Sequence, residues 1–540
     1  MPDGPFRNFG EFHKFLDAND ELRRVSASVD PVLELAEVSD RVMKSQAPHG
    51  PEATGDLDKH VHADKGGRAL IFDNVQGSDI PVAINTFGSY WRITRALGTD
   101  NLEDLAARIG KFVKPVPPPT LAGKVKFAAE AAGDLKGLLP SMSKFLPSVL
   151  RGGAPCQEVV WTDDKIDLDK LPIIQCWPHD GDIDSGQVFG HLGEQITAFK
   201  DKPRTGKYIT LAGIYTKDPD DGTPNVGMYR VQKFDKKTCA MHWHMHHDGA
   251  RHYRGYAKRG ERTPLAIVLG GPSVMPYSAT APLPPGIPEL LFAGFVNRTP
   301  IEMAQCKTID MQVPAEAEIV IEGHVHPTDK LLEGPFGDHT GFYSLADMYP
   351  KFEVSAITMR REPVYPTTIV GKPPMEDYFL GKATERVFLP LLKTLIPDIL
   401  DYSLPMAGVF HNCAYVKIKK EYPQQARRVM HAIWGAGQMA FTKFIIVVDE
   451  HVDVHDEQDV LFHLFANVDP KRDVEMATGV LDILDHSSPK LGIGSKIGFD
   501  ATEKWEGEGY NADVRTWPLE LQMDAATRQQ VDERWSEFGL

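Results

Sequence analysis

The chain has 540 residues, a formal net charge of −16 from 59 Lys and Arg against 75 Asp and Glu, and 42% hydrophobic residues. This length predicts more than one domain, and the ordinary apolar fraction excludes a chain that is disordered throughout. The negative charge argues against nucleic acid as the main partner. The sequence has no run of about eighteen apolar residues for a membrane span, and its start has no signal-peptide pattern.

The first part of the chain alternates helical and strand patterns, which predicts an N-terminal α/β domain over residues 1–113. The predicted elements are helices over 9–22, 31–44 and 94–109 and strands over 69–75 and 80–87.

A Pro-rich and basic segment follows over residues 114–154. Between Lys111 and Arg151 the sequence has seven basic and two acidic residues, a local charge of +5, and apolar residues recur at helical spacing. We interpret it as a helical insertion packed on a neighbouring domain. The alternative is a basic amphipathic helix on an anionic membrane surface. The expected localisation is therefore cytoplasmic, with peripheral membrane contact as the alternative.

The middle of the chain, residues 155–330, changes to a β pattern. Strands are predicted over 208–217, 225–233, 239–246, 265–269 and 317–325. Strands that follow one another this closely indicate a mostly antiparallel sheet or barrel.

Strand and helix patterns alternate again over residues 331–490 and predict a C-terminal α/β domain. Its predicted elements are strands over 413–418 and 443–448 and helices over 423–437 and 457–465. Residues 491–540 are interpreted as a tail with a helix near 519–538.

The five cysteines are far apart and never in CxxC spacing: they are Cys156, Cys176, Cys239, Cys306 and Cys413. An odd number without paired spacing favours reduced thiols over a disulfide framework or a zinc site.

Four histidines lie within seven residues of the stretch Met241-His-Trp-His-Met-His-His-Asp248. On a strand, His242, His244 and His246 would share one face, which suits a metal ion or an anion. The alternative is a half-buried strand face whose imidazoles bond to backbone groups. The sequence has no HExxH motif, so a zinc hydrolase has little support.

A second constellation is Asn225-Val-Gly-Met-Tyr-Arg230, with Glu289 after a Pro-rich stretch. An Asn carbonyl, an imidazole and a carboxylate suit Mn²⁺ or Mg²⁺ better than zinc. Asn225 and Arg230 would point to opposite faces of an unbroken strand. Either a bulge intervenes or one of them lies at the strand end.

A third constellation is the loop Glu333-Gly-Pro-Phe-Gly-Asp338-His-Thr-Gly341. If both carboxylates face one pocket, their repulsion raises the pKa of one and leaves a proton donor beside a base. An arginine between them would hold the other ionised. The alternative is a surface turn with solvated acids.

Together these motifs resemble the UbiD family of decarboxylases, which use prenylated flavin mononucleotide (prenylated FMN). The matching stretches, in family order, are 225–230, 280–286 with Glu289, 333–338, 371–377 and 494–502. The resemblance implies a mixed α/β and β fold in which a split β-barrel flavin-binding domain is flanked by the two α/β domains. The basic insertion and the stretch Asp469-Pro-Lys-Arg-Asp473 further resemble the menaquinone-biosynthesis branch.

The resemblance implies roles for the matching positions. Asn225, His246 and Glu289 correspond to ligands of a divalent metal, usually Mn²⁺, that bridges to the cofactor phosphate. The implied cofactor-binding residues are Asn225, Met228, Tyr229, Arg230, His242, Trp243, His244, His246, His247, Asp248 and Glu289. Backbone oxygens near Val226, Ser278, Ala279 and Ala281 correspond to a site for a monovalent cation such as K⁺. Asn467 stands where many members carry an arginine, so that arginine's contact is not expected here.

Arg230, Glu333 and Asp338 correspond to the family's catalytic network. Side chains alone are poor electron sinks for CO₂ loss from an sp² carbon, so a cofactor has to supply one. We expect Arg230 to orient the substrate carboxylate, Asp338 to donate the proton that replaces CO₂, and Glu333 to be coupled through Arg230.

The expected activity is reversible, non-oxidative decarboxylation of an aromatic or α,β-unsaturated acid. The branch resemblance implies a hydroxynaphthoate of menaquinone biosynthesis, and the alternative is 4-hydroxy-3-polyprenylbenzoate of ubiquinone biosynthesis. A flavin-free metal-dependent hydrolase or an inactive binding module is the alternative of another class. The implied partners are a flavin prenyltransferase that supplies the cofactor and further copies of the chain in a dimer or hexamer.

Overall fold

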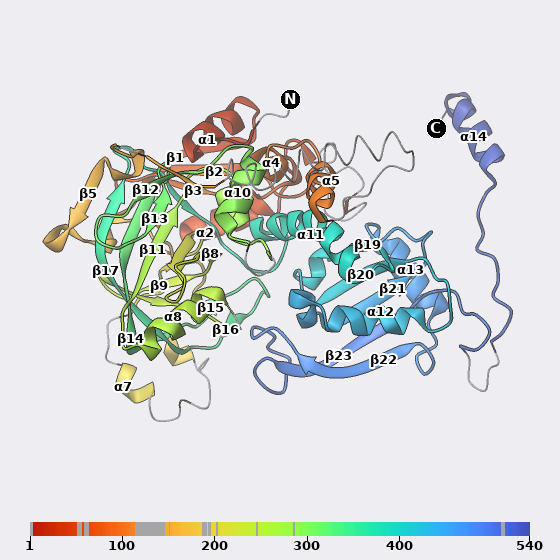
Figure 1. The fold of residues 1–540 in the computed structure, drawn as a ribbon. Helices are drawn as coiled ribbons and strands as arrows, with labels where there is room; N and C mark the ends of the chain where they lie inside the picture. The colour runs from red at the N-terminus through yellow and green to blue at the C-terminus, as the bar shows by residue number, and fades with distance from the viewer. Residues whose placement is uncertain are drawn as a thin grey trace, which may run out of the picture.

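The computed structural model describes residues 4–50, 57–58, 64–113, 146–150, 152–185, 192, 196–200, 204–244, 247–283, 287–508 and 514–539. They form three domains, as the sequence predicts: a β-rich central domain at the left of Figure 1, an N-terminal α/β domain along its upper side and a C-terminal α/β domain at the right. Within these residues, no helix combines the length and hydropathy needed to cross a bilayer. The predicted insertion lies largely outside the described residues, since 114–145 are not among them.

The N-terminal domain packs helices against a four-stranded sheet. Its elements are α1 (Phe9–Ala18), β1 (Leu22–Val29), α2 (Glu34–Met43), β2 (Ala69–Val75), β3 (Val82–Ile84), α4 (Tyr90–Ala96) and α5 (Leu102–Val113). The sheet order is β1-β2-β3-β18, and β18 (Tyr365–Thr367) pairs in parallel with β3 although it follows the central domain in sequence. The helix predicted over 94–109 is two helices, because the chain turns at Gly98 with φ +63°.

The central domain is built on a curled antiparallel sheet. Its strands are β4 (Ser148–Val149), β5 (Val159–Thr162), β6 (Tyr208–Ile209), β7 (Gly213–Lys217), β8 (Pro224–Met228), β9 (Val231–Lys233), β10 (Thr238–Met241), β11 (Thr263–Leu269), β12 (Glu302–Gln305), β13 (Gln312–Pro314), β14 (Ile319–Glu333), β15 (Phe336–Gly337), β16 (Tyr343–Ser344) and β17 (Asp347–Met359). Its helices are α7 (Thr197–Lys200), α8 (Asp248–Lys258), α9 (Met275–Ser278) and α10 (Glu289–Asn297). The main sheet has the order β6-β9-β10-β17-β14-β11-β7-β8, with β5 beside β17.

Two predicted features of the central domain are wrong. The domain boundary predicted at residue 330 cuts through β14, whose pairing with β17 runs from Ile319↔Met359 to Glu333↔Asp347. The strand predicted over 239–246 ends at Met241, so the histidine cluster does not form a strand face. The chain leaves the sheet there and enters α8 at Asp248.

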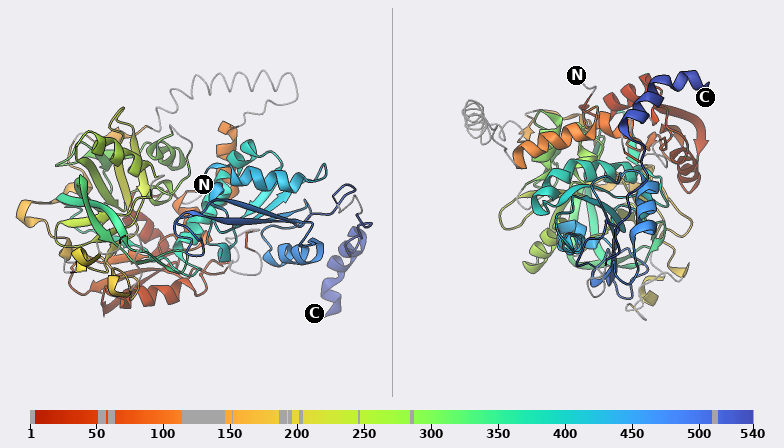
Figure 2. Two further views of the ribbon diagram at one scale, coloured as in Figure 1. Left: turned by 90° about the horizontal axis from the view of Figure 1, so that it is seen from below. Right: turned by 90° about the vertical axis from the view of Figure 1, so that its right-hand side faces the viewer.

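The C-terminal domain packs helices against a five-stranded sheet. Its elements are α11 (Glu376–Leu395), β19 (Ile399–Ser403), β20 (Cys413–Ile418), α12 (Gln425–Trp434), β21 (Phe444–Val448), α13 (Glu457–Asn467), β22 (Val474–Val480), β23 (Ile493–Asp500) and α14 (Ala525–Arg534). The order is β19-β20-β21-β23-β22, so the boundary predicted at residue 490 wrongly leaves β23 out of the sheet. Helix α14 stands away from this sheet in two views (Figures 1 and 2).

Short 3₁₀ turns connect these elements. They are η1 (Pro155–Gln157), η2 (Asp163–Lys165), η3 (Leu168–Lys170), η4 (Ile183–Ser185), η6 (Met406–Gly408), η7 (Gly437–Phe441) and η9 (Trp535–Phe538). All five cysteines are free, as the sequence predicts.

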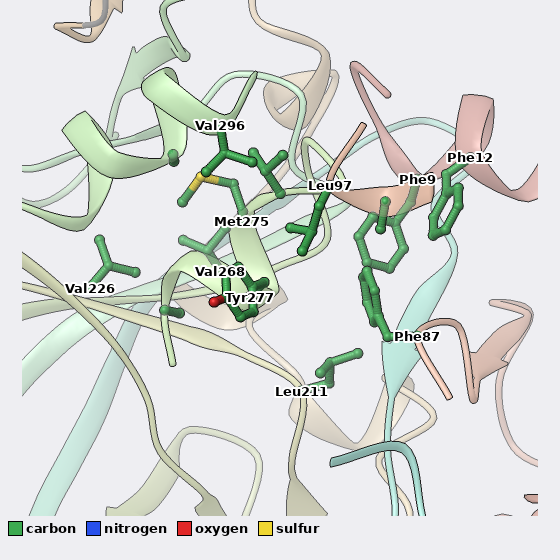
Figure 3. Close-up of a cluster of buried hydrophobic side chains, with 14 of the residues drawn as sticks. Phe9, Phe12, Phe87, Leu97, Leu211, Val226, Val268, Met275, Tyr277 and Val296 are labelled. Atoms are coloured by element: carbon green, nitrogen blue, oxygen red, sulfur yellow. The ribbon is translucent and has the colours of Figure 1, made fainter. Parts of the chain in front are cut away.

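One hydrophobic core joins the N-terminal and central domains. Phe9 and Phe12 of α1 belong to the same buried cluster as Val226 of β8, Val268 of β11 and Val296 of α10 (Figure 3). Burying this much apolar surface in one cluster fixes β8 against α10. The shared core therefore holds in place two of the elements that carry predicted site residues.

Candidate active site

Arg230 lies where the chain passes from β8 to β9. Strand β8 ends at Met228 and β9 begins at Val231, so the alternative that Arg230 lies beyond a strand end is confirmed. Because the pleat is interrupted there, the arginine points toward the loop that follows β14.

The Arg230 guanidinium joins the two predicted carboxylates. Its Nε donates to Glu333 Oε1 at 2.8 Å, Nη2 donates to Glu333 Oε2 at 3.2 Å and to Ser344 Oγ at 2.8 Å, and Nη1 donates to Asp338. The guanidinium carbon lies 4.7 Å from the centre of the Phe336 ring. These contacts use four of the five N–H donors of an arginine, which leaves one on Nη1.

Both carboxyls are held ionised, which corrects the expectation that one of them keeps a raised pKa. Burial alone would raise the pKa of Glu333, but the charge of Arg230 and the hydrogen bonds from His242 and Arg230 lower it to about 2. For Asp338, burial is likewise outweighed by Arg230 and His339, and its pKa falls well below the ordinary range. The arginine lies between the two acids and neutralises their repulsion.

The histidines of the cluster extend this network. His242 Nδ1 lies 2.8 Å from Glu333 Oε2, and His242 Nε2 lies 2.8 Å from His244 Nε2. Since ionised Glu333 only accepts, His242 donates through Nδ1 and receives the proton of His244 at Nε2. Burial and the charge of Arg230 lower the pKa of His242, so it is neutral at physiological pH.

A histidine pair that the sequence analysis missed continues from Asp338. His339 Nδ1 lies 3.0 Å from Asp338 Oδ1, and His339 Nε2 lies 2.9 Å from His411 Nε2 in the C-terminal domain. The ring of Phe410 stacks on His339 at 5.5 Å. Val409 and Phe410 have φ of 42° and 67°, a region that branched and bulky residues rarely adopt, so His411 is presented by a strained loop.

This pair carries its proton on His339. Burial alone would lower the pKa of His339, but the hydrogen bond and charge of Asp338 raise it to about 8. Burial lowers the pKa of His411 to about 4. Burial also raises the pKa of Asp377 to about 7, although the charge of His339 opposes that rise. His339 is therefore a protonated imidazole at neutral pH that donates to both neighbours.

Two of the three predicted metal ligands lie together. Glu289, the first residue of α10, accepts a hydrogen bond from the Val226 N–H at 3.0 Å, directly beside Asn225. Burial raises the pKa of Glu289, the Val226 N–H opposes that rise, and the Asp248 carboxylate adds to it. Burial also raises the pKa of Tyr229. These oxygen-rich side chains fit a hard divalent cation.

Unsatisfied donors near this group favour an anionic ligand. Among the described residues, Asn225 Nδ2 and Trp243 Nε1 are buried and have no hydrogen-bond partner. A buried donor without a partner costs free energy, so a bound phosphate oxygen beside the metal would satisfy it. The residues present therefore fit a metal ion and a phosphorylated cofactor. His246, the third predicted ligand, lies outside the described residues.

Two more of the predicted cofactor residues, His247 and Met228, have contacts that tie β8 to its neighbours. His247 caps α8 and stacks on Tyr229 with ring centres 4.8 Å apart. The Met228 N–H donates to the Ala279 carbonyl at 3.0 Å, which joins β8 to the end of α9.

Asn467, which stands where many family members carry an arginine, ends α13 and donates to the Ala501 carbonyl at 2.9 Å, so it bonds within its own domain.

A cavity of about 730 Å³ lies between the histidines and the C-terminal domain. Its lining residues are His179, His242, His244, Phe342, Tyr343, Ser344, Leu345, Tyr349, Ile483, Leu484, Asp485, His486, Ser488 and Leu491. Apolar walls with a few polar groups suit a planar, partly polar organic acid.

Family models cover most of the chain. Three models of 3-octaprenyl-4-hydroxybenzoate carboxy-lyase match it: the N-terminal domain at residues 14–109, the Rift-related domain at 148–373 and the C-terminal domain at 378–501. An uncharacterized protein of Aquifex aeolicus (strain VF5) is 41% identical over 536 residues, which is 99% of both chains.

Solved structures show the same fold. The UbiD-class enzyme HmfF from Pelotomaculum thermopropionicum, in complex with FMN, matches with a TM-score of 0.71 and 25% identity over 94% of this chain and 97% of that one. An evolved dimeric form of HmfF in complex with prFMN matches with a TM-score of 0.70 and 24% identity over 93% and 96%. The closed form of vanillic acid decarboxylase from Sedimentibacter hydroxybenzoicus matches with a TM-score of 0.76 and 24% identity over 99% of both chains.

Proposed function

The chain belongs to the UbiD family of carboxy-lyases, and we propose that it removes CO₂ from a hydroxynaphthoate with prenylated FMN and a divalent metal. UbiD-class enzymes decarboxylate aromatic or unsaturated acids with prenylated FMN, and this chain is a decarboxylase of that type. The observation that carries the proposal is the buried ion network in which Arg230 bridges Glu333 and Asp338.

Asn225 and Glu289 would hold the metal, and the unsatisfied Asn225 and Trp243 donors would face the cofactor. Mn²⁺ or Mg²⁺ is the metal that this donor set favours. Prenylated FMN, when bound, supplies the electron sink that CO₂ loss from an sp² carbon needs. A K⁺ site at the carbonyls of Val226, Ser278, Ala279 and Ala281 remains part of the proposal, and the Ala279 carbonyl already accepts one hydrogen bond.

Arg230 positions the substrate carboxylate. The N–H that remains on Nη1 is free to bind an anion. Because a guanidinium keeps all its protons and its positive charge, Arg230 takes no part in the proton transfer. Glu333 holds Arg230 in this orientation through two hydrogen bonds, and His242 holds Glu333 through a third.

Proton delivery runs through Asp338. Because Asp338 is ionised in the resting site, it needs a proton before it can act as the donor that the sequence predicts. His339 supplies that proton, since its Nδ1 lies 3.0 Å from Asp338 Oδ1 and its pKa is raised to about 8. His411 accepts the Nε2–H of His339 and so holds the ring in place from the side of the C-terminal domain.

The substrate would bind in the 730 Å³ cavity beside His242 and His244. The aromatic and aliphatic walls support a bicyclic acid, and 4-hydroxy-3-polyprenylbenzoate is the second candidate. The hydrolase alternative has no such support. His242 Nε2 and His244 Nε2 lie 2.8 Å apart, whereas two ligands of one tetrahedral ion lie about 3.3 Å apart.

Co-expression with a flavin prenyltransferase tests the proposal. We expect a coloured protein with flavin absorbance that releases CO₂ from a hydroxynaphthoate faster than from benzoic acids in a panel of aromatic acids. Turnover confined to a polyprenylbenzoate would favour the second candidate. A colourless protein with an intact fold would contradict the cofactor assignment.

Homo-oligomer formation and membrane contact are separate parts of the proposal. The C-terminal domain is the expected site of self-association, and sedimentation of the holoenzyme distinguishes a dimer from a hexamer. Flotation with anionic liposomes tests the basic segment 111–151, and absence of binding would favour its packing on a neighbouring domain.

A further inference from the structure

Three side chains that commonly bind metals meet on the outer side of the C-terminal domain. His451 follows β21, His463 lies on α13, and Glu520 lies in the extended segment that precedes α14. One ligand atom of each lies within 4.8 Å of the others. None of these residues belongs to the network around Arg230.

The distances fit a single tetrahedral ion. Glu520 Oε2 lies 3.2 Å from His463 Nε2 and 3.5 Å from His451 Nε2. With metal–ligand bonds of about 2.0–2.2 Å, neighbouring ligand atoms of a tetrahedral ion lie about 3.3–3.6 Å apart. Both distances to Glu520 are therefore close to those around one tetrahedral ion, and the two imidazole nitrogens lie within 4.8 Å of each other.

The His463 ring is oriented as a metal ligand. Its Nδ1 lies 2.9 Å from the Asp459 carbonyl oxygen, so the Nδ1–H donates there and Nε2 keeps its lone pair. That lone pair faces Glu520 Oε2, so the two acceptors need either a metal ion or a proton between them. A histidine that donates its other N–H to a carbonyl is typical of metal sites, because the bond fixes the tautomer.

The three proposed ligands differ in how far their side chains are exposed to solvent. The His463 side chain is buried, with 6% exposed, whereas His451 and Glu520 are exposed by 49% and 39%. The buried imidazole is the fixed point, and the two exposed ligands leave a path and an open coordination position for solvent.

We propose that His451, His463 and Glu520 bind one Zn²⁺ ion with water as a fourth ligand, and that the ion fastens residues 514–524 to α13. Two imidazoles and one carboxylate favour zinc over Mg²⁺ or Ca²⁺, which prefer oxygen ligands. Leu519, Leu521 and Met523 on the same segment are exposed. The ion would thus attach a part of the segment in which these three apolar side chains do not pack on the described residues.

The competing explanation is a protonated histidine paired with Glu520. The same domain contains a matched control, in which His431 Nε2 lies 3.2 Å from Glu475 Oε1. The second partner of that carboxylate is Arg427, which cannot bind a metal, instead of a second histidine. A His–Glu pair without a third ligand should hold Zn²⁺ weakly, whereas the proposed site should hold one equivalent.

The test uses the full chain after chelator treatment and dialysis against Co²⁺ or Zn²⁺. We expect wild type and His431→Gln to take up one more Co²⁺ than Glu520→Gln, with the intense visible absorption of a tetrahedral ion, and to bind one more Zn²⁺. Glu520→Gln and His463→Gln should bind Zn²⁺ about 100-fold more weakly and lose that absorption. Glu289→Gln should keep both, which separates this site from the cofactor metal.

Limited proteolysis supplies a second readout. Zn²⁺ should slow cleavage within residues 514–524 in wild type and leave the rate in Glu520→Gln unchanged. Glu520 is half exposed, so its substitution preserves the fold even if His463→Gln does not. Equal Zn²⁺ uptake and equal cleavage by wild type and Glu520→Gln would overturn the proposal and favour the protonated pair.

Discussion

The imidazole of His339 lies 2.9 Å from that of His411, Nε2 to Nε2, and this contact joins the central domain to the C-terminal domain beside Asp338. The two residues are 72 positions apart, and each comes from a tight loop. Protonated His339 therefore donates one N–H to the catalytic acid and the other to a side chain of another domain.

The pH dependence of turnover should report the protonation of His339. Its folded-state pKa is raised to about 8, so the protonated form is complete at lower pH and is lost as pH rises through 8. We expect kcat/KM to fall above pH 8 in wild type, and His339→Gln to show a low, flat profile in that range. A basic limb that persists in His339→Gln would assign it to another group.

Asp338→Asn should separate cofactor binding from catalysis. The amide cannot deliver a proton, so we expect kcat to fall by about 10²- to 10⁴-fold while the flavin absorbance stays at the wild-type level. Asp329→Asn is the control, because that side chain on β14 is 53% exposed. Undiminished turnover in Asp338→Asn would rule out the donor role.

Glu289→Gln should weaken retention of the cofactor. The substitution keeps the shape but removes the charge that a divalent cation needs next to Asn225. We expect less flavin and less Mn²⁺ per chain after gel filtration, measured by absorbance and elemental analysis. Glu302→Gln on the exposed surface of β12 should retain both. An unchanged flavin content in Glu289→Gln would count against the ligand assignment.

Arg92→Met should destabilise the N-terminal domain. Arg92 and Glu21 are both fully buried with Nη1 and Oε2 2.6 Å apart, so removal of the arginine leaves a buried carboxylate without its main partner. We expect local unfolding of β1–β3 to become easier by about 3–5 kcal/mol. Hydrogen exchange of peptides from these strands measures it. Arg24→Met, which breaks the exposed Arg24–Asp73 pair, should cost less than about 1 kcal/mol.

The sequence predicted the parts of the site that lie in short motifs. Arg230, Glu333 and Asp338 meet as expected, because the strand ends after Met228 and Glu333 bring both loops to one place. The partnership of His339 with His411 could not be predicted, since no local pattern relates residues from two domains. The prediction that one carboxyl keeps a raised pKa is also wrong. That pKa depends on how closely Arg230 approaches both acids, which the sequence does not report.

The errors in the fold have local causes. The sequence predicts that this strand ends at residue 325, because the polar stretch 326–330 resembles a turn. In β14 the pairing register does shift between Val325 and Lys330, but the strand continues. Strand β1 was missed because it is largely exposed and lacks a buried alternating face. Both strands are defined by partners distant in sequence, which short-range periodicity does not report.

The edge strand β18 has a consequence for synthesis of the chain on the ribosome. Residues 365–367 complete the N-terminal sheet beside β3, so that sheet has an open edge until the whole central domain has been translated. Glu376, which accepts the Phe87 N–H at 2.7 Å, is made later still. The first domain to leave the ribosome is thus among the last to be finished, and its open edge is a site where a chaperone would protect the nascent chain.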